Sequence, residues 1–181
     1  MGKYHNLIRY NKMDKCEICN GEGVGVSFYI QGCPIHCPGC FNPETWDFDG
    51  GEPITGYVES QLYKALKPDY IQRLSILGGE PLVWDNLYQL NYILCTVKSN
   101  WPQKKVWIYT GYTWEELQEA SRKNNPNYLF VTFKYSDYLV CGPFIEAEKD
   151  LTLKWRGSRN QRIIDIQATK ENCNKPIYIF E

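Results

Sequence analysis

Three closely spaced cysteines carry the strongest chemical signal in this chain. Cys33, Cys37 and Cys40 are separated by three and then two residues in the segment "GCPIHCPGC". A structural zinc site usually takes four protein ligands, and a disulfide framework takes an even number of cysteines. Three thiols in one loop therefore predict a metal centre that the loop by itself leaves incomplete.

A zinc ribbon is one interpretation of these cysteines. Cys16 and Cys19 form a CxxC pair, and Cys37 and Cys40 form a second pair seventeen residues further along. Two CxxC pairs at this separation are typical of a zinc-binding module without enzymatic activity. This interpretation leaves Cys33 without a role.

A 4Fe-4S cluster is the other interpretation. Cys33, Cys37 and Cys40 would bind three of the four irons, which leaves the fourth iron without a protein ligand. An open metal position can bind and activate a substrate, whereas a closed site only supports the fold. We expect His36, the neighbour of Cys37, to line the loop or face solvent rather than to supply a fourth ligand.

A glycine-rich segment offers a second candidate binding element. Gly78, Gly79 and Glu80 directly follow the apolar run "LSIL", and Thr110 and Gly111 end the run "VWIYTG". Glycines let a backbone approach a ligand closely, and ligands of parallel α/β sheets bind beyond the carboxyl ends of the strands. A "GGEP" segment alone is more often a plain turn, so this prediction depends on the cysteine loop beside it.

Apolar runs alternate with segments of helical period along the chain, which predicts an α/β fold. We expect strands at 26–30, 74–77, 106–111, 137–142, 161–166 and 176–181, and helices at 54–67, 83–97 and 113–123. Residues 124–136 fit no single type of element. The 181 residues suit a single domain over 1–181 with five or six strands.

The composition excludes several broad classes of protein. The chain is 43% hydrophobic and 23% charged with a net charge of -1, unlike a disordered chain or a basic nucleic-acid binder. No apolar run is long enough for a membrane span, and the polar N-terminal segment does not resemble a signal peptide. We therefore expect a cytoplasmic protein with no nucleic-acid or membrane partner, whose eight cysteines are thiols or metal ligands.

The cysteine loop after one strand and "GGEP" after the next resemble the radical S-adenosylmethionine enzymes. Within that superfamily, four blocks resemble the family of activases that serve anaerobic ribonucleotide reductases. These blocks span residues 20–48, 77–82, 107–117 and 141–165, over half of the chain and in family order. The resemblance implies a partial (β/α) barrel that is open on one side, so that a protein loop can enter laterally.

The resemblance also implies roles for individual residues. Cys33, Cys37 and Cys40 would hold a 4Fe-4S cluster, whose free iron chelates S-adenosylmethionine. The remaining cofactor contacts would come from Gly39, Cys40, Phe41, Gly78, Gly79, Glu80, Thr110 and Gly111. The block Arg156, Gly157, Ser158, Asn160 and Gln161 would contact either the cofactor or the partner, or be a solvated basic face.

The implied reaction is reductive cleavage of S-adenosylmethionine to a 5'-deoxyadenosyl radical, which abstracts a hydrogen from one glycine of the large reductase subunit. The implied partners are that subunit and a reducing electron donor such as flavodoxin, with a homodimer possible. An activase of another glycyl radical enzyme, or a small-molecule radical enzyme, stays open as an alternative. The family motifs leave the CxxC of Cys16 and Cys19 unexplained, and Cys95 and Cys173 are expected to be ordinary thiols.

Overall fold

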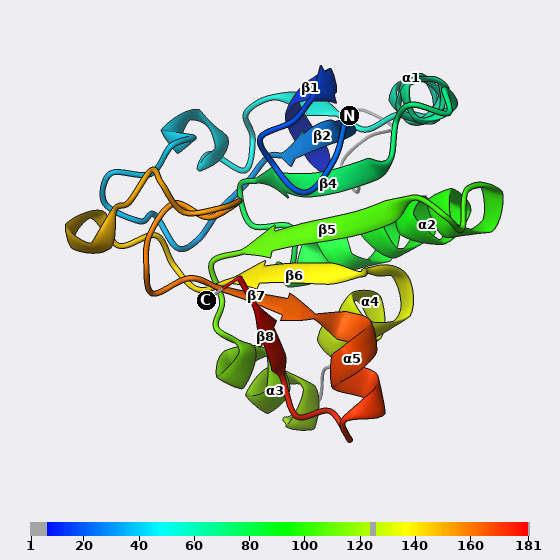
Figure 1. Ribbon diagram of the computed structural model, residues 1–181. Coiled ribbons are helices and arrows are strands. Elements are labelled where there is room, and N and C mark those ends of the chain that lie inside the picture. Colours follow the sequence, from blue (N-terminus) through cyan, green and yellow to red (C-terminus); the bar gives the residue numbers. More distant parts are fainter. Residues whose placement is uncertain (1–6, 124–125, 181) are drawn as a thin grey trace.

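One mixed β-sheet organises the protein. The computed structural model describes residues 7–123 and 126–180, and within them eight strands follow the order β3-β1-β2-β4-β5-β6-β7-β8 (Figure 1). The strands are β1 (Arg9–Glu17), β2 (Gly25–Ile30), β3 (Glu52–Pro53), β4 (Arg73–Gly78), β5 (Lys105–Thr110), β6 (Tyr138–Cys141), β7 (Arg162–Asp165) and β8 (Ile177–Ile179). The four central strands β2, β4, β5 and β6 are parallel, and antiparallel pairs extend the sheet at both ends. The carboxyl ends of the central strands therefore meet at one edge of the sheet, where the long loops gather.

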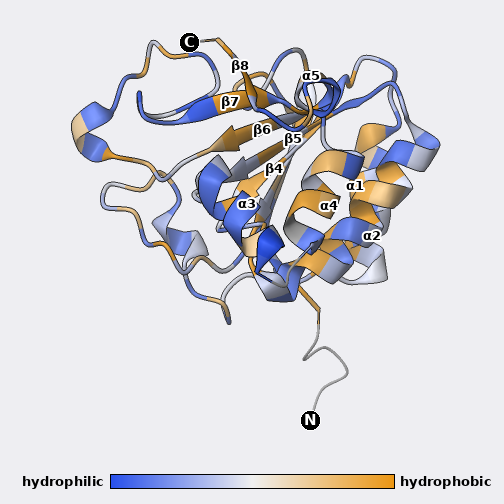
Figure 2. Ribbon diagram, turned by 90° about the horizontal axis from the view of Figure 1, so that it is seen from below, coloured by the Kyte–Doolittle hydropathy of each residue, from blue (hydrophilic) through white to orange (hydrophobic). Residues whose placement is uncertain are grey.

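Helices cover one face of this sheet. They are α1 (Gly56–Leu66), α2 (Trp84–Asn100), α3 (Trp114–Arg122), α4 (Asn127–Tyr135) and α5 (Ile166–Glu171), with short 3-10 turns η1 (Pro43–Thr45) and η2 (Glu146–Glu148). Figure 2 shows α1, α2 and α4 together on one side of the central strands. Leu62 of α1 and Leu90 of α2 are fully buried in one core with Phe28 and Ile76 of the sheet. The apolar spacing of three and four residues in each helix produces this buried stripe.

The opposite face of the sheet is polar at its centre. Because side chains alternate along a strand, Ser27, Arg73 and Ser75 lie on the face away from the helices, and all three are fully buried. Trp107 packs there in a separate small cluster with Val140 and Ile163. The candidate site lies on this face and beyond the carboxyl ends of the central strands.

The predicted α/β class is confirmed, and so are all six predicted strands. The predicted strand count of five or six is wrong, because β1 and β3 were missed. β1 is mostly half-buried and carries polar and charged residues between its apolar ones, and β3 is two residues long. Neither strand has the apolar run by which a buried parallel strand is recognised. The topology is that of an open mixed sheet, and a laterally open (β/α) barrel stays a proposal.

Helices α1, α2 and α3 confirm the predicted helical segments. The capping box predicted at the start of α3 is present, since Thr113 Oγ1 accepts from the N–H of Glu116 and the Glu116 carboxylate accepts from the N–H of Thr113. The ambiguous segment contains α4, although residues 124 and 125 lie outside the described chain. Helix α5 was not predicted, because its six residues are too few for a helical period to stand out.

Candidate functional site

The cysteine loop begins where β2 ends and is fixed there by backbone hydrogen bonds. The N–H of Gly32 donates to the carbonyl of Thr45 at 2.8 Å, and the N–H of Cys33 donates to the carbonyl of Trp46 at 3.1 Å. Gly32 has a φ of +93°, and a Cβ there would lie 2.4 Å from the ring of Phe48. Only glycine fits both this conformation and this close approach.

The three cysteines of the loop differ in exposure. Cys33 is buried, and Cys37 and Cys40 are half-buried. Burial raises the pKa of the Cys33 and Cys37 thiols, while backbone N–H groups near each sulfur partly oppose that rise. The thiol form is therefore favoured without a metal, and binding of a metal would release protons.

The other residues considered for this metal site take different positions. His36 is exposed and stacks on Trp46 with 4.7 Å between ring centroids, as expected for a residue that lines the loop. Cys16 lies one residue before the end of β1, Cys19 follows the strand, and both are exposed. Cys19 lines the same cavity as Cys33, Cys37 and Cys40, whereas Cys16 does not. Within residues 7–123 and 126–180, no three His, Cys, Asp or Glu side chains converge closely enough to enclose a single metal ion, neither in the trio nor in the zinc-ribbon grouping.

The glycine segment after β4 packs tightly on the cysteine loop. A Cβ at Gly79 would lie 2.3 Å from the carbonyl oxygen of Gly32, and a Cβ at Gly78 would lie 2.8 Å from that of Ile30. The N–H groups of Gly79 and Glu80 donate to these same carbonyls at 2.7 and 2.8 Å. The two glycines therefore serve close packing of backbone on backbone.

Glu80 is buried at the centre of this packing. Its carboxylate accepts hydrogen bonds from Thr110 Oγ1 at 2.8 Å, from the N–H of Gly111 at 2.7 Å and from the N–H of Leu82 at 2.9 Å. Burial raises the pKa of Glu80 to about 7, although these three donors pull it down. Glu80 can therefore hold a proton near neutral pH, or exchange that proton for a cationic partner.

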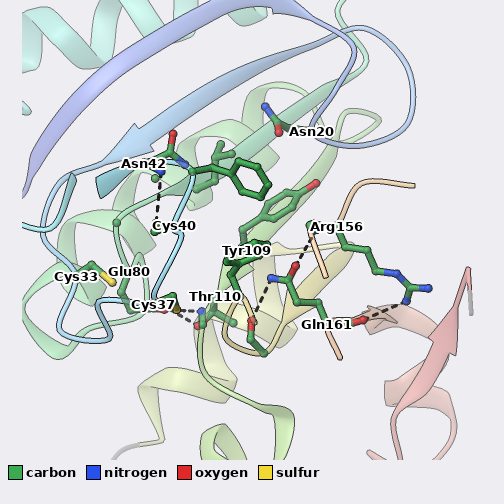
Figure 3. A pocket seen from close by; sticks show the side chains of 18 of the residues that line it. Asn20, Cys33, Cys37, Cys40, Asn42, Glu80, Tyr109, Thr110, Arg156 and Gln161 are labelled. Atoms are coloured by element: carbon green, nitrogen blue, oxygen red, sulfur yellow. Dashed lines mark hydrogen bonds between the residues drawn. The ribbon is translucent and has the colours of Figure 1, made fainter. Parts of the chain in front are cut away.

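A cavity of about 500 Å³ brings nearly all the predicted site residues together. Its lining includes Cys33, Cys37, Cys40, Phe41, Gly78, Gly79, Glu80, Thr110 and Gly111. Gly39 is the one predicted contact that does not line it. Figure 3 shows the cysteines and Glu80 on one side of the cavity and Tyr109 and Gln161 facing them. The volume falls in the range of small-molecule sites.

Several lining residues were not predicted from the sequence. Tyr29 and Tyr109 point inward from β2 and β5, and Phe144, Leu151 and Trp155 come from the chain between β6 and β7. The two tyrosines follow the alternation of their strands and were within reach of a period-two argument. The others lie in a segment without regular secondary structure, so no periodicity predicted their direction.

Residues 143–161, which we call the strap, connect β6 to β7 and cross the cavity edge. Gln161 organises the strap, because its Oε1 accepts from the N–H of Gly157 at 2.8 Å and of Ser158 at 3.2 Å. Its Nε2 donates to the carbonyl of Gly142 at 3.1 Å, and Asn160 Nδ2 donates to that of Pro143 at 2.7 Å. The predicted block 156–161 is thus a compact loop, not a solvated basic face.

The donor set is compatible with an iron-sulfur cluster. Each thiolate of a 4Fe-4S cluster binds a different iron, so its cysteines surround a volume. Cys33, Cys37 and Cys40 lie in one loop, and all three line one cavity.

Comparison with known proteins places this site in a class. Residues 19–164 match the model of a family described as a 4Fe-4S single cluster domain. The match includes the cysteine loop, the glycine segment and the whole strap.

Individual relatives narrow the class. The chain is 32% identical over 158 residues to the anaerobic ribonucleoside-triphosphate reductase-activating protein of Enterobacteria phage T4, covering 86% of this chain and 93% of the relative. The protein of the same name from Vibrio cholerae is 34% identical to this chain, and the match covers 86% of this chain and 97% of the relative. The one from Pasteurella multocida is 36% identical, and the match covers 87% of this chain and 96% of the relative. The chain belongs to the family of anaerobic ribonucleoside-triphosphate reductase-activating proteins.

Proposed function

We propose that this protein is the iron-sulfur activase of an anaerobic, class III ribonucleotide reductase. The observation that carries the proposal is that three cysteines of one loop line one cavity together with the buried Glu80. The activity named for the relatives supports the same assignment.

In this proposal Cys33, Cys37 and Cys40 hold a 4Fe-4S cluster with one iron open, and S-adenosylmethionine binds beside it. When bound, the cluster and the cofactor supply a 5'-deoxyadenosyl radical, which makes a glycyl radical on the large reductase subunit. The protein's own part is to bind, orient and exclude water. Tyr29, Tyr109 and Phe144 bring apolar ring surface to the cavity, as a site that must shield a reactive species requires.

Glu80 is assigned to the amino group of the cofactor. A buried carboxylate whose pKa is raised to about 7 gains most from a cationic partner, because that partner restores the interactions lost on leaving water. Thr110 and Gly111 were expected to contact the cofactor, and both donate hydrogen bonds to Glu80. We assign them to holding this carboxylate, and both also line the cavity.

The substrate in this proposal is a protein, so one side of the cavity must admit a loop. We propose that the protein is a single domain with a laterally open barrel and that it is located in the cytoplasm. We further propose a reducing electron donor such as flavodoxin as a partner, and a homodimer as the possible assembly. No described helix has the length and apolar character of a membrane span.

The experiment that tests the proposal is anaerobic reconstitution with iron and sulfide, followed by addition of S-adenosylmethionine, reductant and a class III reductase subunit. We expect about four irons per chain and a glycyl radical signal by electron paramagnetic resonance. Cys33→Ala should abolish cofactor cleavage, whereas Cys95→Ala, at an exposed position of α2, should leave it unchanged. Full cluster content without a glycyl radical on the cognate subunit would overturn the assignment as its activase.

A further inference from the structure

The strap meets the cysteine loop at two successive places. A Cβ on Gly39 would lie 2.8 Å from the carboxylate carbon of Glu146. The ring of Phe41, which directly follows Cys40, contacts the ring of Phe144 edge-on at 5.0 Å between centroids.

Gly157 is the point where this contact is tightest. A Cβ built on Gly157 would lie 2.7 Å from the Phe41 ring and 3.2 Å from the Phe144 ring. The φ of Gly157 lies outside the left-handed region, so the backbone itself would accept an alanine. The absence of a side chain at this position therefore serves the seating of Phe41 and Phe144.

Gln161 holds Gly157 in place from the other side. Its side-chain carbonyl accepts from the N–H of Gly157 and of Ser158, and its amide donates to Gly142 at the start of the strap. In Figure 3, Gln161 lies within the cavity, whereas the guanidinium of Arg156 extends away from the cysteines. The guanidinium of Arg156 donates to the carbonyl of Gln161 at 3.1 Å, so it too supports the strap.

We propose that the strap is a positioning element for the iron-sulfur cluster, in which Gly157 and Gln161 seat Phe41 and Phe144 against the cysteine loop. This inference rests on the proposed function, because it assumes a cluster on Cys33, Cys37 and Cys40. It assigns the block 156–161 to support of the cluster. The sequence alone had allowed three roles for this block: contact with the cofactor, contact with the partner, or a solvated basic face.

A physical effect follows from this contact. Covering the loop slows the departure of iron, and loss of an outer partner of a metal ligand typically costs about 10–100-fold in metal affinity. Loosening the strap should therefore speed iron release.

The test uses Gly157→Ala in the full-length protein, reconstituted anaerobically. We expect iron release to a chelator to be about tenfold faster or more than in the wild type. Gly56→Ala is the matched control, because a Cβ on Gly56 meets nothing within 4 Å.

A second variant separates positioning from folding. Phe41→Leu shortens the side chain that the new methyl group would strike, so the double variant Gly157→Ala/Phe41→Leu should recover slower iron release. If Gly157→Ala releases iron as slowly as Gly56→Ala does, the inference is overturned and the proposed function stays intact. Wild-type protein that never assembles a cluster would instead overturn the proposed function.

Discussion

Thr110 Oγ1 donates a hydrogen bond to Glu80 Oε1 at 2.8 Å, and this bond joins the ends of two neighbouring parallel strands. Glu80 follows β4 and Thr110 ends β5, so the buried carboxylate is held by the strand beside its own. The same Thr110 oxygen accepts from the N–H of Tyr112 at 3.1 Å, which fixes the direction of its proton toward Glu80. The position of Glu80 in the cavity is therefore set before any ligand binds.

The first prediction concerns pH. The pKa of Glu80 is raised from 4.5 to about 7, so between these pH values the folded protein retains a proton that the unfolded chain loses. The contribution of this bound proton to the free energy of unfolding therefore decreases as pH rises from 4.5 to 7. Glu80→Gln removes the titration. We expect the difference in unfolding free energy between wild type and Glu80→Gln to change by up to about 3 kcal/mol between pH 4.5 and 8 in cluster-free protein. Urea unfolding at several pH values measures it, and a constant difference would contradict the assignment.

A second prediction concerns Thr110→Val, which keeps the shape of the side chain and removes the donor. Glu80 then loses one of its three hydrogen bonds while it stays buried. We expect a loss of about 1–3 kcal/mol at pH 8, where the carboxylate is charged, and a smaller loss at pH 5. Chemical unfolding at the two pH values checks this, and equal losses would show that the bond does not depend on the charge of Glu80.

The ion pair beneath the CxxC turn supports a third prediction. Arg73 Nη1 lies 2.7 Å from Glu17 Oε1, with the arginine side chain fully buried. Burial alone would raise the pKa of Glu17, but hydrogen bonds from Arg73 and Ser27 outweigh it and the net shift is downward. Arg73→Met leaves this carboxylate without its cation and should cost about 3–5 kcal/mol.

The matched control for that pair is Lys12→Met. The ammonium of Lys12 lies 3.7 Å from Asp14 at an exposed position, and such pairs contribute at most about 1 kcal/mol. Thermal or urea unfolding of both variants decides the comparison. Equal losses of unfolding free energy for the two substitutions would show that the buried pair contributes no more to stability than the exposed pair.

Thiol reactivity gives a fourth prediction. Burial raises the pKa of Cys141 to about 11, whereas Cys16, Cys19, Cys95 and Cys173 are exposed. In the cluster-free, folded protein we expect the four exposed cysteines to react with an alkylating reagent first and Cys141 last. Mass spectrometry of peptides at successive times gives the order. Early modification of Cys141 would indicate that β6 opens more readily than its burial implies.

The sequence predicted the residues on the cysteine side of the cavity better than those on the strap side. Cys33, Cys37 and Cys40 could be found because ligand spacing in one loop is a local property, and Gly79 because a glycine after a buried strand is visible in the chain itself. Phe144, Leu151 and Trp155 reach the cavity because the chain returns from β6 to β7, and no local pattern encodes that return. Strand β1 was missed for a related reason. Its half-buried position near the side of the sheet tolerates charged residues, and these interrupt the apolar pattern by which a strand is recognised in a sequence.

The distance along the chain between the cysteine loop and the strap sets an order of assembly. Residues 33–41 are synthesised early, but the elements that cover them, at 143–161, lie more than a hundred positions later and take their place only when β7 has paired with β6. On the proposed assignment, a carrier that delivers iron and sulfide meets a finished receptacle only after residues 143–161 have left the ribosome. Maturation of the metal centre then follows the folding of the strap.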